Sequence, residues 1–307
     1  MIEAILLAIA PIALLILLGH EIRRRKFLAD AFWPLAERLS YFILLPALFV
    51  HGLAMADLSA APVASMAAAL FAATLGAAAV LVAVKPWLGV DGPAFTSLFQ
   101  GGVRFNNYVG ISVAIGLFGS AGLTFAAVAN AVIVPTVNIL CILTFARWGS
   151  ARLSGRAALK GLALNPLLLS CLLGAALQAT GLGLPPGLDA CLKALGQASL
   201  PIGLLCVGAA LDWEALRRGI APALKASAAK FLMVPALGVI ACGVVGLEGQ
   251  AAQATILFLS LPTASSAYVL ARQMGGDAPL MAAIVAFQTL LAAAATPAAL
   301  MLASRWL

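Results

Sequence analysis

The sequence predicts an all-α integral membrane protein, and three observations support this fold class. Hydrophobic residues make up 64% of the 307-residue chain and charged residues only 9%, whereas soluble domains carry roughly 25% charged residues. Apolar runs close to the ~20 residues that cross a lipid bilayer recur from end to end. The scarce prolines and aspartates also recur at a fixed spacing, which indicates two related halves.

Hydropathy, with glycine, proline and charge as punctuation, predicts ten transmembrane helices in a single polytopic transporter domain, 1–307. Their approximate ranges are 2–19, 34–54, 62–84, 95–119, 122–146, 159–180, 192–211, 220–246, 252–274 and 278–303. Nine or eleven spans are also compatible with the pattern. The first span has no basic residue before it and HEIRRRKF after it, the reverse of a secretory signal peptide, so we expect it to be retained. Asn165 with Pro166 predicts a kink in the sixth span.

Basic residues gather in alternate loops. The loop after span one holds the run from Arg23 to Lys26, and the loop after span five holds Arg147, Arg152, Arg156 and Lys160. Because basic loops stay on the cytoplasmic side, ten spans place both termini on the outer side of the cell inner membrane. This topology accounts for the net charge of +7 without a nucleic-acid partner, so the lipid bilayer is the expected surrounding.

Metal and cofactor chemistry find little support in the sequence. The five cysteines lie mostly inside apolar runs and show no paired or metal-ligand spacing: Cys141, Cys171, Cys191, Cys206 and Cys242. The acidic residues all fall near span ends or in loops, so the sequence offers no clear intramembrane carboxylate as a proton relay or strong cation site. We expect no metal and no cofactor, and the coupling ion, proton or sodium, is left open.

Matches at an offset of 155 residues join the two halves of the chain. They pair Pro11 with Pro166, Gly19 with Gly174, Pro46 with Pro201 and Asp57 with Asp212. The halves then cover about 1–147 and 158–307. Five spans in each half force opposite orientations, so the pattern predicts the inverted repeat found in many secondary transporters.

At the same offset the fourth span aligns with the ninth, and each carries helix-breaking residues at its middle. Span four contains GGVRFNNYVG and span nine contains LPTASS, with Pro262 placed 155 residues after Asn107. Glycine, asparagine and proline weaken a helix interior, so both spans are predicted to unwind there. Unwound segments in corresponding positions point to a transporter's substrate site. The predicted substrate-binding residues are Arg104, Asn106, Asn107, Pro262, Thr263, Ser265 and Ser266.

The chemistry of these segments suits a carboxylate, because half-helix N-termini and asparagine amides offer hydrogen-bond donors. Arg104 would add electrostatic attraction, but a long side chain at this depth can also snorkel to the interface. Asn106 and Asn107 either line the site or hold helices together by hydrogen bonds. The same alternative applies to the predicted cavity-wall residues Asn130, Asn138 and Gln288.

Several stretches together resemble one known family: RFNNYVGISVAIGLFG, NAVIVPTVNIL, LNPLLLSCLLG, SLPIGLLCVGAAL and LPTASSAYVLARQMGGDAPLMAAIVAFQTL. They are similar to the bacterial auxin efflux carrier family, with its malonate and malate permease-like members, over nearly the whole chain. The resemblance implies ten helices in two inverted five-helix repeats, similar to PIN carriers and the bile acid sodium symporter fold. It also implies that the fourth and ninth helices cross at their breaks, where substrate binds. Span four departs from the family in having no proline at its break.

These observations predict a secondary active transporter of small organic anions, namely carboxylates, working by elevator-type alternating access. A passive anion channel would need a continuous polar lining, and a membrane enzyme would need clustered acids or a Cys or His dyad; the spans show neither. The alternatives are the passive anion channel, which single-channel currents would establish, and a non-transporting membrane sensor. The carboxylate, the direction of transport and the oligomeric state are also open, with a homodimer as one option.

Overall fold

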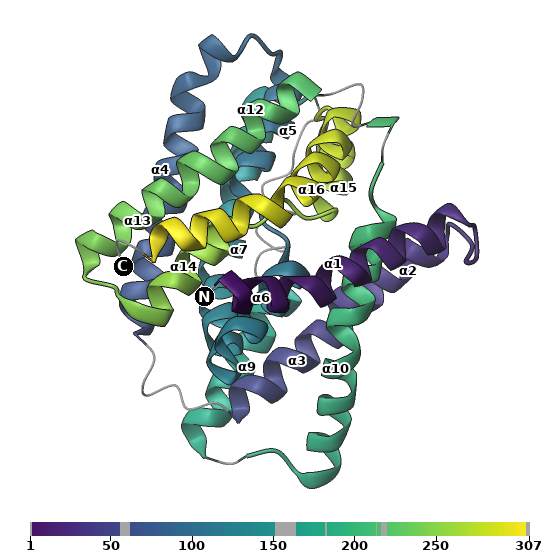
Figure 1. The fold of residues 1–307 in the computed structure, drawn as a ribbon, viewed down its shortest axis with the longest axis vertical. Helices are drawn as coiled ribbons and strands as arrows, with labels where there is room; N and C mark the ends of the chain where they lie inside the picture. The colour runs from purple at the N-terminus through teal and green to yellow at the C-terminus, as the bar shows by residue number, and fades with distance from the viewer. Residues whose placement is uncertain are drawn as a thin grey trace. The chain divides into compact units, whose positions relative to one another are not determined.

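The computed structural model describes residues 2–55, 62–150, 164–181, 183–212, 214–215 and 220–304. Within these ranges the chain is helical and contains no β-strand (Figure 1). Six helical segments there are long and apolar enough to cross a membrane: 32–54, 63–88, 120–148, 186–209, 220–245 and 278–303. They correspond to the predicted spans two, three, five, seven, eight and ten, so the chain is a multi-pass membrane protein.

The chain divides into two compact units, and each unit takes segments from both halves of the sequence. Unit 1 comprises Met1–Pro62, Asn107–Ala131 and Ala163–Ala210. Its elements are α1 (Ile2–Arg24), α2 (Phe32–Leu39), the π-helical turn η1 (Ser40–Leu44), α3 (Leu45–Ala54), α6 (Asn107–Phe118), the first part of α7 (Ser120–Trp148), α9 (Pro166–Thr180) and α10 (Pro186–Ala209).

Unit 2 comprises Val63–Asn106, Val132–Leu162 and Leu211–Leu307. Its described elements are α4 (Val63–Leu88), α5 (Gly92–Val103), the rest of α7, α12 (Ile220–Ala228), the π-helical turn η2 (Ala229–Met233), α13 (Val234–Val245), α14 (Gly249–Leu259), α15 (Ser266–Met274) and α16 (Ala278–Ala303). The segment from α12 to α13 runs alongside α4, as Figure 1 shows.

Two glycines allow α1 and α10 to pack closely in unit 1. A Cβ atom on Gly19 would lie 2.1 Å from the carbonyl oxygen of Leu205, and one on Gly208 would lie 1.8 Å from the carbonyl oxygen of Ile16. In addition, the guanidinium of Arg23 donates a hydrogen bond to the carbonyl of Ala209. The two helices therefore meet backbone to backbone, which no larger residue permits at these positions.

The substitution Gly208→Ala is expected to destabilise unit 1, because the added Cβ meets backbone atoms that no rotamer change can move. Overpacking of this kind typically costs 1–3 kcal/mol, and we expect about 3 kcal/mol here. Gly243→Ala in α13 is the matched control: it gains the same helix propensity, and its Cβ has no atom within 4 Å. Thermal unfolding in detergent measures both variants, and equal midpoints would contradict the close contact.

Both predicted helix breaks are present. Helix α5 ends at Val103 and α6 begins at Asn107, and the intervening Arg104 is extended, with φ −75° and ψ 159°. Helix α14 ends at Leu259 and α15 begins at Ser266. The prediction that spans four and nine unwind at their middle is therefore confirmed.

The bounds of the elements follow the spacing of 155 residues. Shifted by this offset, α4 covers 218–243, and the α12 to α13 segment covers 220–245. Shifted likewise, α7 covers 275–303, and α16 covers 278–303. The opposite orientation of the two halves stays a prediction.

The predicted kink at Asn165 and Pro166 is wrong. Asn165 is the N-cap of α9, where its Oδ1 accepts hydrogen bonds from the N–H groups of Leu167 and Leu168 at 2.9 and 3.1 Å. Pro166 occupies the first helical position, where a backbone N–H has no intrahelical partner to lose. The pair therefore starts a helix instead of bending one. The predicted start of span six at 159 lies outside the described residues, as does Asp57.

Candidate functional site

The two breaks are joined inside unit 2 by a buried hydrogen-bond network centred on Gln288 of α16. The N–H and the hydroxyl of Thr263, in the second break, lie 3.0 and 2.7 Å from Gln288 Oε1. Gln288 Nε2 donates to the carbonyl oxygen of Gly101 at 2.9 Å, and the Thr263 hydroxyl lies 3.1 Å from the same oxygen. Thr263 and Gln288 are both 0% exposed. We call these three residues the break network.

The break network satisfies a helix end that would otherwise be unpaired. The last four carbonyls of a helix lack intrahelical partners, and Gly101 is one of these residues in α5. Inside a membrane such a carbonyl must find a partner in the protein. Gly101 also permits close approach, because a Cβ there would lie 2.7 Å from Ile284 Cγ2 and 3.1 Å from Ala226 Cβ. The missing side chain thus lets α12 and α16 reach the end of α5.

An aromatic contact adds to the pairing of the two breaks. Phe105, in the first break, packs edge-on against Phe258 of α14, with ring centroids 5.9 Å apart. Both rings are buried. Edge-to-face pairs of this kind contribute roughly 0.5–1.5 kcal/mol beyond the area they bury. The first break is therefore held to the helix that leads into the second.

Arg104 contacts another of the predicted residues. Its Nη1 donates to Oδ1 of Asn138 on α7 at 3.0 Å. The side chain is half-buried, and the thiol of Cys141, three residues further along α7, is a further hydrogen-bonding neighbour. The structure therefore brings Arg104 and Asn138 together next to the end of α5.

The three other predicted asparagine positions differ in surroundings. Asn106 lies in the first break and is 1% exposed. Asn107 begins α6, which belongs to unit 1, and its Oδ1 is buried without a hydrogen-bond partner in the part of the chain that the structure describes. Asn130, in the unit 1 part of α7, donates to the carbonyl of Ala126 in its own helix at 2.8 Å. Asn130 is thus placed by its own helix and not by the breaks.

The predicted residues of the second break range from buried to exposed. Pro262 is buried beside Thr263. Ser265 is half-buried at the N-terminus of α15, and Ser266, the first residue of that helix, is exposed. Of the predicted residues, the break network therefore contains only Thr263 and Gln288.

Gln100 and Lys230 are among the buried polar residues of unit 2 that the predicted set does not contain. Gln100 is 0% exposed, and its Nε2 lies 3.4 Å from the carbonyl oxygen of Ala267 in α15. Lys230 lies in η2, within the apolar run ASAAKFLMVPALGVIACGVV. A lone ionisable residue within an apolar span indicates a functional site, so the sequence alone could have identified Lys230 as a candidate.

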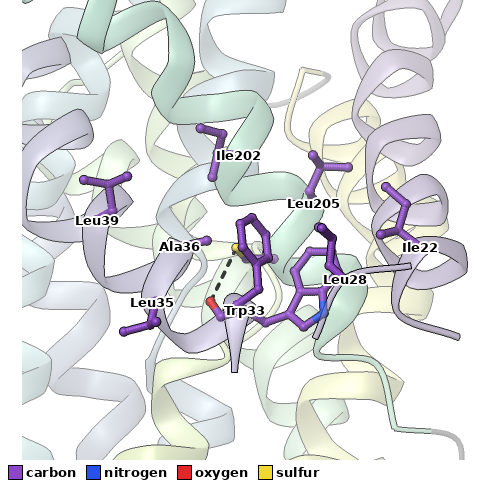
Figure 2. A pocket seen from close by; sticks show the side chains of 10 residues that line it. Ile22, Leu28, Trp33, Leu35, Ala36, Leu39, Ile202 and Leu205 are labelled. Atoms are coloured by element: carbon purple, nitrogen blue, oxygen red, sulfur yellow. Dashed lines mark hydrogen bonds between the residues drawn. The ribbon is translucent and has the colours of Figure 1, made fainter. Parts of the chain in front are cut away.

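An apolar cavity of about 320 Å³ lies in unit 1 and is shown in Figure 2. Its lining residues come from α1, α2, α10 and the connection from α1 to α2: Ile22, Leu28, Phe32, Trp33, Leu35, Ala36, Leu39, Ile202, Leu205 and Cys206. Cys206 lies against α2, with its Sγ 3.9 Å from the carbonyl oxygen of Trp33. Ligand sites combine apolar walls with a few convergent polar groups, but this lining contains no charged side chain, and its donors are limited to the indole N–H of Trp33 and the weak thiol donor of Cys206. The cavity is therefore a poor carboxylate site.

Long apolar helices and two hydrogen-bonded helix breaks define a multi-pass membrane protein of the transporter class. The sequence matches the family described as membrane transport protein over residues 4–300, and the chain belongs to that family. It is 26% identical over 299 residues to a protein of Methanothermobacter thermautotrophicus described as an uncharacterized transporter, and the alignment covers 94% of this chain and 95% of the relative. The predicted resemblance to the auxin efflux carrier family is confirmed, and the chain is a transport protein and not an enzyme.

Proposed function

We propose that the chain is a secondary active transporter of small carboxylates in the cell inner membrane, with substrate bound where the fourth and ninth helices break. The observation that carries this proposal is the pairing of the two breaks through Gly101, Thr263 and Gln288. Secondary transporters form substrate sites from discontinuous helices at corresponding positions of two repeats. The proposed substrate-binding residues remain Arg104, Asn106, Asn107, Pro262, Thr263, Ser265 and Ser266.

The composition of unit 2 supports a negatively charged substrate. The helices of unit 2 whose bounds are given above contain no aspartate or glutamate, whereas Arg104 lies at the end of α5. Asn138 takes one of the five N–H donors of the guanidinium, which leaves others for an anion. Arginine is well suited to a carboxylate because its planar fork can donate two parallel hydrogen bonds.

We further propose elevator-type alternating access with ten helices in two inverted repeats and both termini outside. Support comes from the composition of the two units, each of which combines matching elements from both halves of the sequence. Helix α3 and its counterpart α10 both lie in unit 1. Helix α4 and its counterpart, the α12 to α13 segment, both lie in unit 2. Alternating access requires one body that moves against another, and the elevator type is the form in which the substrate site moves with one of them.

Transport in proteoliposomes tests the function. The purified chain is reconstituted, and uptake of labelled mono- and dicarboxylates is measured while gradients of pH, sodium and voltage are imposed separately. We expect saturable uptake of at least one carboxylate. Unitary currents in planar bilayers would establish a channel instead, and movement of cations or neutral solutes without carboxylates would reject the proposal. Movement of no solute at all would favour a sensor.

Alanine at Asn106 or Asn107 is expected to weaken the apparent affinity for carboxylate by roughly 10-fold or more, because a hydrogen bond to a charged group contributes about 1.5–3 kcal/mol. The concentration dependence of uptake measures this effect. Gln197→Ala, at an exposed amide of α10, is the control that should leave uptake unchanged. Unchanged affinity in correctly folded Asn106 and Asn107 variants would assign both residues to helix packing.

A further inference from the structure

Lys230 is a buried lysine in the middle of a membrane-spanning segment. It lies in the π-helical turn between α12 and α13 and is 1% exposed. No hydrogen bond or ion pair joins it to any residue among those the structure describes. An unpaired buried ammonium is strongly disfavoured, and π-helical turns occur frequently at functional sites. Packing alone does not explain a lysine at this position.

The contacts of α4 fix the depth of Lys230 in unit 2. Near the start of the segment, Lys225 Nζ donates to the carbonyl oxygen of Leu88 at 2.6 Å. Further along, Leu237 faces Gly76, where a Cβ would lie 3.6 Å from Leu237 Cδ1. The segment is therefore antiparallel to α4, and Lys230 lies between these two contacts.

Helix α5 reaches the same depth at its C-terminal end. A Cβ on Gly102, the penultimate residue of α5, would lie 2.5 Å from Leu81 Cδ1. Leu81 lies between Gly76 and Leu88, the two residues of α4 that bracket Lys230. Lys230 is therefore level with the point at which α5 breaks.

The turn that carries Lys230 packs against the two helices that carry Gly101 and Gln288. The residues closest to the position of a Cβ on Gly101 are Ala226 on α12 and Ile284 on α16. Ala226 lies in the last turn of α12, directly before the π-helical turn with Lys230, and Ile284 lies one turn before Gln288 on α16. Gln288 reaches the carbonyl of Gly101, and η2 packs against both α5 and α16.

Among the residues that the structure describes, no carboxylate lies on the elements packed against the turn with Lys230. These elements are α4, α5, α12, α13 and α16, and their titratable side chains are Lys85, Lys225 and Cys242. Lys85 lies over the rings of Phe95 and Trp148 at the end of α4, and Lys225 is held by Leu88. Arg104, after α5, is a further cation. An ammonium at Lys230 would therefore have to be neutralised by a bound anion.

We propose that Lys230 carries the proton that couples carboxylate transport to the pH gradient, which rests on the proposed function. When the site is empty, the amine is neutral because an ammonium would have no counterion. When a carboxylate binds at the breaks, its charge favours the ammonium, so the amine takes up one proton from the same aqueous side. When the carboxylate leaves on the other side, the ammonium releases that proton.

Proteoliposomes containing a pH-sensitive dye test this coupling. Wild-type protein should move about one proton with each carboxylate and accumulate carboxylate toward the alkaline side. Lys230→Met should lose the accompanying proton movement and reduce uptake driven by the pH gradient more than 10-fold. Lys230→Arg, which keeps its charge at all accessible pH values, should bind carboxylate but also lose the coupling. Lys225→Met, on the same helical segment, is the matched control and should keep it.

The outcomes separate the two proposals. If wild-type protein moves no carboxylate, the proposed function fails, and the coupling role fails with it. If wild-type protein moves carboxylate and Lys230→Met keeps the proton movement, Lys230 is not the carrier and the function stands. If Lys230→Met does not fold, proton uptake on carboxylate binding is compared in weakly buffered detergent between wild type and Lys230→Arg. Uptake by the wild type alone supports the proposal, and equal uptake by both overturns it.

Discussion

Gln288→Leu is expected to abolish transport and to destabilise unit 2. Leucine has a similar size but leaves the carbonyl of Gly101 and the N–H of Thr263 without their Gln288 partner, in a site where Gln288 is 0% exposed. A buried unsatisfied group costs about 1–3 kcal/mol, although hydrogen bonds measured in membrane proteins average about 0.6 kcal/mol. We expect a loss of about 2–4 kcal/mol, seen as a lower midpoint of thermal unfolding, together with loss of carboxylate uptake.

Three further variants distinguish the loss of the break network from a general effect of substitution in unit 2. Gln273→Leu replaces an exposed glutamine of α15 in the same unit and should leave both stability and uptake unchanged. Thr263→Ser keeps the hydroxyl and should retain most of the activity, whereas Thr263→Val removes the contacts of that hydroxyl with Gln288 and Gly101. If Gln288→Leu unfolds at the wild-type midpoint and transports normally, the break network does not hold the two breaks together.

The breaks themselves could be predicted because their causes are local. Glycine, asparagine and proline lower helix stability wherever they stand in a helix interior, and a repeat offset then aligns one weak point with the other. Asn107 and Pro262 carry both signals in this sequence. The structure places a helix end next to each of them. Local propensity and internal repetition were therefore sufficient for this part of the fold.

The partners within the break network could not be predicted in the same way. Helices α7 and α16 are apolar on all sides, so hydrophobic periodicity does not indicate which face turns inward. Gln288 was expected at a cavity wall, but its bonds to Thr263 and Gly101 depend on how α16 is rotated. Asn165 shows a similar limit, because the same residue pair can bend a helix or begin one. The rotation of α16 and the role of Asn165 are determined by how the helices pack, which the sequence pattern does not show.

Two roles were predicted for Arg104: attraction of an anionic substrate and snorkelling to the interface. Its contact with Asn138 favours the first. A snorkelling side chain extends toward water along its own helix. Here the residue has left helix α5, is half-buried, and donates to an amide oxygen on another helix at 3.0 Å. This bond restrains the guanidinium before any substrate arrives. Such preorganisation lowers the entropy that binding an anion would cost.

Arg104→Gln is therefore expected to reduce carboxylate uptake by about 10- to 100-fold, which corresponds to losing a charge-assisted hydrogen bond of about 1.5–3 kcal/mol. Arg104→Lys should recover part of the affinity, because it keeps the charge but not the planar fork. Arg272→Gln, at an exposed arginine of α15, is the control for the lost charge. Concentration-dependent uptake in proteoliposomes measures all three. Equal uptake by Arg104→Gln and Arg272→Gln would leave snorkelling as the role of Arg104, whereas a loss confined to Arg104 would tie the guanidinium to the substrate.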